Sequence, residues 1–257
     1  MDSENQHKRR NRTTDAKRVG LARALSKLGY CSRAQAAKLV REGKVRLNGS
    51  VSRNPEVPVR TGKDRIEVDG RAIREAEKIY LLLNKPRGYV TTAADEKGRA
   101  TVYALLPEAL EWVAPVGRLD RASEGMLLFT NDSEWAAKIS DPSSHLDKTY
   151  HLQIARLADE RMLAALRRGV ATPQGELLKC KEVRVLRAGE KNCWLEMVLD
   201  EGKNRQIRRM TDRIGVAVLR LIRVSIGPLP LGDLAKGAYR RLREEEKAAI
   251  DRSLGLR

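Results

Sequence analysis

The sequence predicts an α+β protein with two domains. A small unit of two helices and a hairpin comes first, and a larger domain follows, with a mostly antiparallel or mixed central sheet flanked by helices. Helical spacing near the start gives way to alternation, and apolar runs of strand length recur from residue 79 without regular βαβ order. A chain of 257 residues is long enough for two such cores.

The N-terminal stretch divides into a tail and a first helix. Residues 1–18 are polar and of mixed charge with no apolar segment, so we expect a disordered basic tail and not a secretory signal. Leu21, Leu25 and Leu28 then recur at i, i+4 and i+7, the spacing of one helix face. Gly29 is expected to end this helix.

A second helix and a hairpin are predicted next. Ser32 with Gln35 three residues later forms a capping box, in which each side chain satisfies the other's backbone donor. Asn48-Gly49 tolerates positive φ at both turn positions, so the chain is expected to return as a hairpin through Val51. The predicted unit spans residues 19–70.

The net charge indicates the partner. Lys plus Arg number 51 against 34 Asp plus Glu, giving +17 and a pI near 10.1. Such a protein binds a polyanion, and nucleic acid is the leading candidate over a membrane surface. The longest apolar runs, such as residues 79–83, fall far short of the roughly 20 residues that a membrane-spanning helix needs. A cytoplasmic location is expected.

No cofactor or metal is predicted. Cys31, Cys180 and Cys193 are far apart and form no C-x-x-C unit, and the three histidines lack metal-ligand spacing. Neither G-x-x-x-x-G-K-[ST] nor G-x-G-x-x-G occurs, so the sequence has no nucleotide-binding loop of these kinds. Any reaction must therefore run on side chains.

The first domain is strongly basic. Residues 19–70 hold eleven Lys or Arg against five acids, which favours phosphate binding over an ordinary solvated surface. The motifs at residues 21–25, 29–33 and 43–49, with the order of elements, resemble an S4 RNA-binding domain. That resemblance implies that exposed basic side chains grip structured RNA: Arg33, Lys38, Arg41, Lys44 and Arg46.

Residues 71–77 are short and polar and are interpreted as a linker to the domain at 78–257. An apolar run at residues 79–83, bounded by Asn84-Lys85-Pro86-Arg87-Gly88, indicates a buried strand entering a tight loop. Further strands are expected at residues 125–130, 150–155, 183–186, 193–199 and 216–224. Helices are expected near residues 159–168, 204–213 and 244–253.

One carboxylate lies among guanidiniums just before a strand-like run. Asp120 stands between Arg118 and Arg121, and for an arbitrary Asp this would mean charge balance or a turn cap. The whole segment, residues 117–132, resembles the signature of the RsuA/RluB/RluF family of ribosomal RNA pseudouridine synthases. In that family the Asp of GRLD is catalytic, which implies this role for Asp120.

The resemblance implies three further site residues. Arg208 of the Q-I-R motif would form a salt bridge with the catalytic carboxylate, although a basic helix is also typical of a solvated or RNA-facing surface. Tyr150 of the K-x-Y motif would stack on the target base, whereas alternation alone favours a core aromatic. Leu221 would form an apolar wall of the uracil pocket, with Leu219 as the alternative in register.

Pseudouridine formation breaks the C1′–N1 bond, rotates the uracil and rejoins it through C5, so it needs no cofactor. A carboxylate can act as nucleophile or stabilise charge at the sugar. The base must first be flipped out of the RNA, and Arg118 is expected either to assist this or to orient Asp120. Candidate phosphate contacts are Lys85, Arg87, Lys203 and Arg205.

These observations predict an enzyme that isomerises a specific uridine in ribosomal RNA, acting as a monomer on the RNA or on an assembling subunit. The sequence of residues 201–206 resembles the large-subunit branches of the family, which favours 23S over 16S RNA. Two alternatives stay open: a non-catalytic S4-type RNA-binding or ribosome-assembly factor, and a DNA-binding regulator, for which no groove-reading helix is identified. The target uridine and the choice between a covalent and an elimination route at Asp120 are not specified by the sequence.

Overall fold

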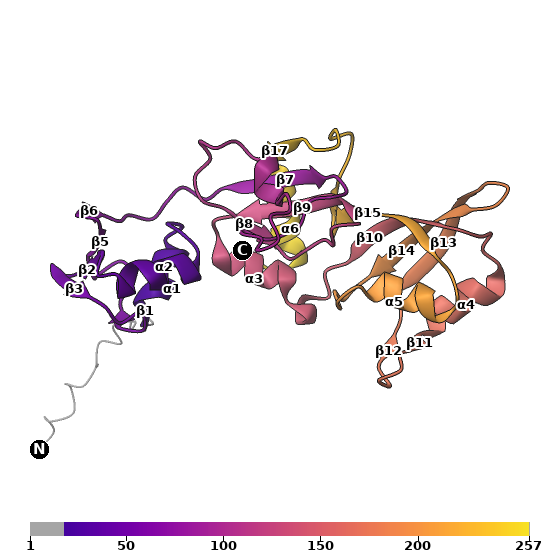
Figure 1. Ribbon diagram of the computed structural model, residues 1–257, viewed down its shortest axis with the longest axis horizontal. Helices are drawn as coiled ribbons and strands as arrows, with labels where there is room; N and C mark the ends of the chain where they lie inside the picture. The colour runs from indigo at the N-terminus through magenta and orange to yellow at the C-terminus, as the bar shows by residue number, and fades with distance from the viewer. Residues whose placement is uncertain (1–17, 257) are drawn as a thin grey trace, which may run out of the picture. The chain divides into compact units, whose positions relative to one another are not determined.

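The computed structural model describes residues 18–256 and divides into two compact units, one ending at Ala76 and the other beginning at Glu77 (Figure 1). The predicted disordered tail, residues 1–18, lies almost wholly outside the described residues. Among residues 18–256, no helix is long and apolar enough to cross a membrane.

The first unit has the predicted helix–helix–hairpin order. Helices α1 (Leu21–Lys27) and α2 (Arg33–Arg41) pack on a small sheet in the order β3-β2-β5-β6. Its strands are β2 (Val45–Leu47), β3 (Ser50–Ser52), β5 (Ile66–Val68) and β6 (Arg71–Ala72), and β1 (Val19–Gly20) pairs separately with β4 (Pro58–Val59).

Local sequence signals explain these elements. The Ser32 hydroxyl accepts from the Gln35 backbone N–H at 3.1 Å, while the Gln35 side chain accepts from the Ser32 N–H at 3.2 Å, so the capping box is confirmed. Asn48 and Gly49 both have positive φ, 51° and 86°, as the hairpin turn requires. The two helices and the turn therefore form where the sequence predicts them.

The second unit is built on a nine-stranded sheet. Its order is β13-β14-β10-β15-β9-β7-β17, with β8 beside β9 and β16 beside β15. The β15–β9 pair is parallel and the other pairs are antiparallel, which confirms the expected mixed sheet. The strands are β7 (Tyr80–Lys85), β8 (Ala114–Val116), β9 (Glu124–Thr130), β10 (Lys148–Ile154), β13 (Glu182–Ala188), β14 (Cys193–Leu199), β15 (Val218–Ile226), β16 (Leu229–Pro230) and β17 (Tyr239–Arg241).

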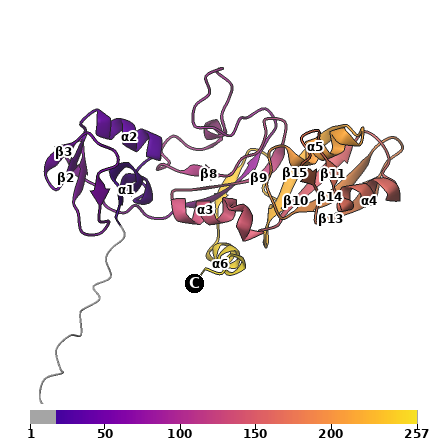
Figure 2. The same cartoon turned by 90° about the horizontal axis from the view of Figure 1, so that it is seen from below.

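The β7–β9 half of this sheet is buried on both faces. One face packs against α3 (Ser133–Ser140) and α6 (Glu244–Ser253), which lie on the same side of the strands (Figure 2). The opposite face packs against the short 3-10 helix η1 (Val102–Leu105). Every residue of β9 is consequently buried, in agreement with the apolar run of residues 126–129 at its centre.

The other half, β10, β13, β14 and β15, is covered on one face only. Helices α4 (Glu160–Arg168) and α5 (Gln206–Arg213) pack there (Figure 1), and a two-stranded ribbon of β11 (Val170–Ala171) and β12 (Leu177–Leu178) lies at the edge. Buried and partly exposed residues alternate strictly along β14. This alternation is typical of a half-buried strand.

Several boundaries differ from the sequence-based expectation. The strand expected at residues 79–83 runs from Tyr80 to Lys85, and the one expected at 216–224 runs from Val218 to Ile226. Helix α3 was not predicted, although Asp132 at its N-cap accepts hydrogen bonds from the backbone N–H groups of Glu134 and Trp135. An Asp directly before a helix is a readable start signal.

Candidate active site

Asp120 lies in the loop that joins β8 to β9 and lines a pocket in the second unit. The pocket is bounded by this loop, by the facing strands β10 and β15, and by the start of α5. Asp120, Tyr150, Arg208 and Leu221 all line it, so residues that are far apart in the sequence meet here.

Hydrogen bonds to backbone carbonyls hold the Asp120 loop in place. The Thr91 hydroxyl donates to the Leu119 carbonyl at 2.8 Å, and the Leu119 side chain is buried in the core. Gly88 and Arg121 exchange two further bonds, from the Gly88 N–H to the Arg121 carbonyl at 2.8 Å and from the Arg121 Nε–H to the Gly88 carbonyl at 3.2 Å. The loop thus presents Asp120 from a fixed position.

Lys85 anchors the same loop from inside the protein. Its side chain is fully buried, and Nζ donates to the carbonyls of Pro86, Asp120 and Ser123 at 3.0, 3.1 and 2.8 Å. Burial lowers the pKa of Lys85 to about 8, against the opposing effect of Asp120. The prediction that Lys85 contacts an RNA phosphate is wrong, because its ammonium is turned inward and cannot reach a ligand.

The carboxylate of Asp120 forms its ion pair with Arg205 and not with Arg208. Its side chain is 31% exposed, and Oδ2 lies 3.5 Å from Arg205 Nη1. Arg205 caps α5 in the left-handed region with φ 49°, a conformation that non-glycine residues adopt at some cost. Strain of this kind gathers at functional sites.

Arg208 lies in the same pocket without the predicted salt bridge. Its Nη2 donates to the Ala122 carbonyl at 3.4 Å, and its buried Nε has no hydrogen-bond partner among residues 18–256. Burial lowers the pKa of Arg208, the charge of Arg205 lowers it further, and Asp120 opposes both. The expectation is corrected in this respect: Arg205, at the first turn of α5, reaches the carboxylate, whereas Arg208 reaches only the loop backbone.

The strands place the remaining pocket residues on one face of the sheet. Paired residues on neighbouring strands point to the same side, and one such row crosses the five central strands. It consists of Met197, Tyr150, Arg223, Gly125 and Lys85.

Leu221 pairs with Leu152 on the same face and is almost completely buried at the pocket wall. Leu219, the alternative in register, is 43% exposed and does not line the pocket. The register therefore places Leu221, and not Leu219, beside Asp120 and Tyr150.

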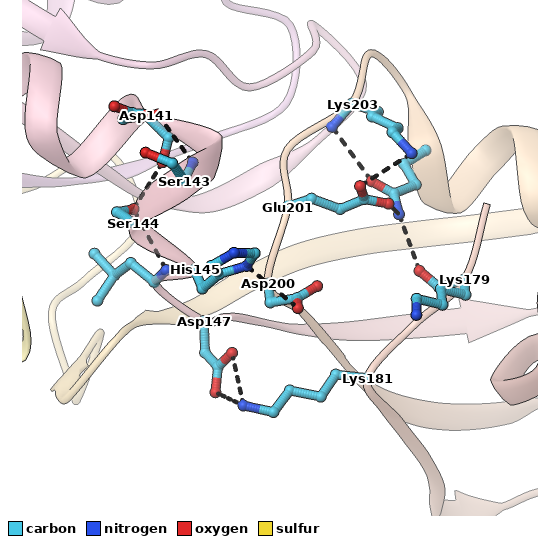
Figure 3. Close-up of polar contacts among 12 residues, drawn as sticks. Asp141, Ser143, Ser144, His145, Asp147, Lys179, Lys181, Asp200, Glu201 and Lys203 are labelled. Carbon is cyan, nitrogen blue, oxygen red and sulfur yellow. Dashed lines mark hydrogen bonds and ion pairs between the residues drawn. The ribbon is translucent and has the colours of Figure 1, made fainter. Parts of the chain in front are cut away.

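The predicted phosphate contacts fall at different places. Arg118, Lys203 and Arg205 line the pocket, whereas Arg87 is exposed outside its lining. Lys203 Nζ is held by Glu201 at 3.0 Å, as Figure 3 shows, and by Glu176 at 3.4 Å. Lys203 is therefore partly neutralised in this structure.

A buried glutamine supports the loop that carries Lys203 and Arg205. Gln206 Nε2 donates to Glu201 Oε1 at 2.6 Å and to the Lys179 carbonyl at 3.0 Å, and its Oε1 accepts from the Lys203 N–H at 3.3 Å. Nearby, Lys181 pairs with Asp147 at 2.8 Å, outside the pocket (Figure 3). The contacts of Gln206 tie the start of α5 to Glu201, Lys203 and Lys179, and the Lys181–Asp147 pair takes no part in them.

In the first unit, all five predicted RNA-binding residues are exposed: Arg33, Lys38, Arg41, Lys44 and Arg46. Arg33 pairs with Glu56 at 3.1 Å and Lys44 with Glu42 at 2.9 Å. The Lys44 ammonium holds the pKa of Glu42 below its usual value. Such exposed pairs are weak and leave the cations available to a stronger anion.

Two pocket residues were missed by the sequence reasoning. Lys148 begins the K-x-Y motif and Arg223 lies within β15, and both line the pocket. Alternation from Tyr150 would have placed Lys148 on the pocket face. Arg223 could have been found only by pairing β15 with β10, which needs the register.

The geometry defines a class of protein. A single carboxylate beside an arginine in a strongly basic pocket, in a chain with a separate basic helix–hairpin unit, is suited to chemistry on RNA. The comparisons agree: the model of the RNA pseudouridylate synthase family matches residues 79–213, and that of the S4 domain matches residues 19–66.

Similar proteins cover nearly the whole chain. An uncharacterised RNA pseudouridine synthase of Aquifex aeolicus is 37% identical over 240 residues, 93% of this chain and 96% of that protein. Ribosomal large subunit pseudouridine synthase B of Bacillus subtilis is 36% identical over 88% of this chain and 93% of that protein. A crystal structure of a pseudouridylate synthase superposes with a TM-score of 0.64 at 28% identity, covering 90% and 99% of the two chains.

The chain belongs to the RNA pseudouridylate synthase family and carries an S4 domain. The resemblance noted in the sequence is thereby confirmed. The family also favours the enzyme over a non-catalytic RNA-binding factor.

Proposed function

We propose that the protein isomerises a specific uridine of ribosomal RNA to pseudouridine, with 23S RNA favoured over 16S RNA, and that it does so as a monomer in the cytoplasm. The observation that carries this proposal is the fixed carboxylate of Asp120 in a basic pocket of a family member. The large-subunit preference is supported by the names of relatives from Bacillus subtilis and Pseudomonas aeruginosa, each 36% identical.

The proposed chemistry begins with Asp120 facing the anomeric carbon of a flipped uridine. Its carboxylate either adds to C1′ or stabilises the positive charge that develops there as the C1′–N1 bond breaks. Arg205, 3.5 Å away, orients the carboxylate, and the hydrogen bonds from Lys85 to the carbonyls of Asp120 and Ser123 hold its loop in place. The freed uracil then rotates and rejoins through C5.

The pocket walls would hold the base, and the basic surfaces would hold the strand. Tyr150 and Leu221 line the pocket on one face of the sheet, where an aromatic ring and an apolar side chain can bracket a uracil. The backbone phosphates are assigned to exposed cations: Arg87, Arg118, Lys203 and Arg205 near the pocket, and Arg33, Lys38, Arg41, Lys44 and Arg46 in the S4 domain.

The test is Asp120→Asn, which keeps the shape of the side chain and removes its charge. We expect no pseudouridine, detected by carbodiimide-blocked reverse transcription, with the RNA dissociation constant within about threefold of wild type, because the phosphate contacts remain. Asp233→Asn, an exposed acid outside the pocket, is the matched control and should retain full activity.

Pseudouridine formation by Asp120→Asn at the wild-type rate would contradict the assignment of Asp120. Tight RNA binding without product from the wild-type protein would favour a binding factor instead. Assaying 23S and 16S RNA side by side tests the large-subunit preference, and modification of 16S RNA alone would overturn it.

A further inference from the structure

Two cations on the pocket side of the sheet have no anionic partner. Lys148 and Tyr150 are two residues apart on β10, and Arg223 pairs with Tyr150 across β15, so all three side chains belong to one face. All three line the pocket with Asp120. In residues 18–256, neither Lys148 nor Arg223 forms an ion pair.

Arg223 is unusual because it is buried as well as unpaired. Its side chain is only 6% exposed, Nε–H donates to the Met126 carbonyl at 2.8 Å, and the buried Nη2 has no hydrogen-bond partner within the described part of the chain. A buried guanidinium with an unused donor is costly to maintain. The structure therefore holds an uncompensated positive charge at the floor of the pocket.

Lys148 adds a second charge beside it. Burial lowers the pKa of Lys148, and the charge of Arg223 lowers it further, against the weaker effects of Asp147 and Asp200. The contribution of Arg223 to this shift means that the two cations repel each other across the pocket face. An anion placed between them would relieve that repulsion.

The same strand shows that the fold neutralises an arginine where no ligand is needed. Arg220 lies on the opposite side of β15 and binds Glu124 through Nε and Nη2, both at 3.1 Å. Lys236 joins the same carboxylate at 2.6 Å. The absence of any such acid beside Arg223 is thus confined to the pocket face.

We propose that Lys148 and Arg223 stabilise the negative charge of the uracil ring while it is detached from the sugar, an inference that rests on the proposed function. As the C1′–N1 bond breaks, its electron pair stays on the uracil, whose charge spreads over the ring nitrogens and carbonyl oxygens. C5 then bonds to C1′, C5 loses its proton, and N1 gains one. No electron or atom is gained overall.

The position of the pair favours the base over a phosphate as its ligand. Arg223 lies between Tyr150 and Gly125 in the cross-strand row, on the floor of the pocket, and the base is the part of a flipped nucleotide that enters deepest. Arg118 and Lys203 provide more accessible cations for the sugar–phosphate backbone. Preorganised charges held beside a developing anion stabilise it strongly.

The test compares two target bases that differ in acidity. Lys148→Met and Arg223→Gln are assayed in single-turnover reactions on RNA that carries uridine or 5-fluorouridine at the target, following loss of the N-linked nucleoside. For uridine we expect a rate reduction of roughly 10²-fold for each variant, with RNA affinity within about threefold of wild type. For the more acidic fluorinated ring, which leaves more easily, the reduction should shrink about tenfold or more.

Two controls separate this role from a structural one. Lys181→Met removes a nearby exposed lysine outside the pocket and should not change either rate. Arg223→Lys keeps the positive charge and should recover part of the rate that Arg223→Gln loses. Lys148→Met, at a partly exposed position, provides the test even where a change at Arg223 prevents folding.

Equal reductions on the two bases would overturn the proposal, and so would a loss found wholly in RNA affinity, which would identify a phosphate contact. Asp120→Asn remains inactive on both bases if the proposed function is correct. Failure of this inference therefore differs from failure of the proposed function, in which the wild-type protein itself forms no pseudouridine.

Discussion

The two halves of the large sheet differ in how they are buried. Strands β7 and β9 are covered on both faces, and every residue of β9 is inaccessible. Strands β10, β13, β14 and β15 are covered by α4 and α5 on one face, whereas the other carries polar side chains such as His151, Glu196 and Arg184. The first half is suited to rigidity, and the second leaves room for ligands.

The pocket lies where the halves meet, at the parallel pair of β9 and β15. The doubly buried half supplies the carboxylate, because the Asp120 loop leads into β9 and is tied to Lys85 at the end of β7. The half covered on one face supplies the base-binding wall, Tyr150 and Leu221. Catalytic precision and substrate access are thus assigned to different parts of one sheet.

The largest expected effect on stability comes from a substitution at Gly125, where β9 of one half lies against β15 of the other. This residue has φ 98°, and an added Cβ would collide with the carbonyl oxygen of Arg223 and lie 2.8 Å from its nitrogen. Gly125→Ala should therefore lower the free energy of unfolding by about 4 kcal/mol or more, since both neighbours are backbone atoms. Chemical denaturation measures this loss.

Gly117→Ala is the matched control for that change. Gly117 also has positive φ, 73°, but nothing lies within 4 Å of an added Cβ. Its cost should be only the backbone strain, about 1–2 kcal/mol. Equal losses at the two glycines would show that the close approach of β9 and β15 contributes nothing.

A smaller effect is expected when the carboxylate loop loses its buried anchor. Lys85→Met leaves the carbonyls of Pro86, Asp120 and Ser123 without their donor, which should cost about 3 kcal/mol of stability and lower kcat. RNA affinity and its salt dependence should stay unchanged, because Lys85 is not at the surface. A weaker dependence of RNA affinity on salt concentration in Lys85→Met would instead support a contact between Lys85 and an RNA phosphate.

The stability effect of Lys85 should also depend on pH. Burial lowers its pKa to about 8 in the folded protein, so between pH 8 and about 10.4 the unfolded chain binds more protons. The wild type therefore gains stability relative to Lys85→Met as pH rises through this window, by roughly 2 kcal/mol. A constant difference between the two proteins across this range would contradict the lowered pKa.

The same comparison shows what could be read from the sequence. Part of the doubly buried half was predictable, because the apolar run of residues 126–129 within β9 has the length of a strand and the GRLD resemblance identified Asp120 beside it. The fold class and the helix–helix–hairpin unit followed from periodicity, the capping box and the Asn48-Gly49 turn, and its resemblance to an S4 domain came from the motifs. These signals depend only on residues close together in the sequence, so they can be recognised without a structure.

The contacts that cross between elements could not be read in the same way. Lys85 looks like a surface cation in Asn84-Lys85-Pro86, and only the packing of β7 against the Asp120 loop buries it. The choice of Arg205 over Arg208 depends on a left-handed residue at the start of α5. Arg223 required the register of β15 against both neighbours.

The smallest effects compare two carboxylates that each contact two basic side chains. Glu124 is 1% exposed and binds Arg220 and Lys236, so Glu124→Gln should cost about 2 kcal/mol, less than a fully buried pair because both partners reach water. Glu196 binds Arg184 and His151 on the open face, and Glu196→Gln should cost less than about 1 kcal/mol.

Measuring the free energy of unfolding at acid pH tests the contribution of Glu124 further. Burial raises the pKa of Glu124, but its hydrogen bonds with Arg220 and Lys236 outweigh that effect and lower the pKa overall. The stability that Glu124 contributes is therefore present above the usual glutamate range and is lost as the pH falls through the lowered pKa. The gap between wild type and Glu124→Gln should close in acid. Equal costs for the two substitutions at pH 7 would mean that burial on both faces does not distinguish the halves energetically.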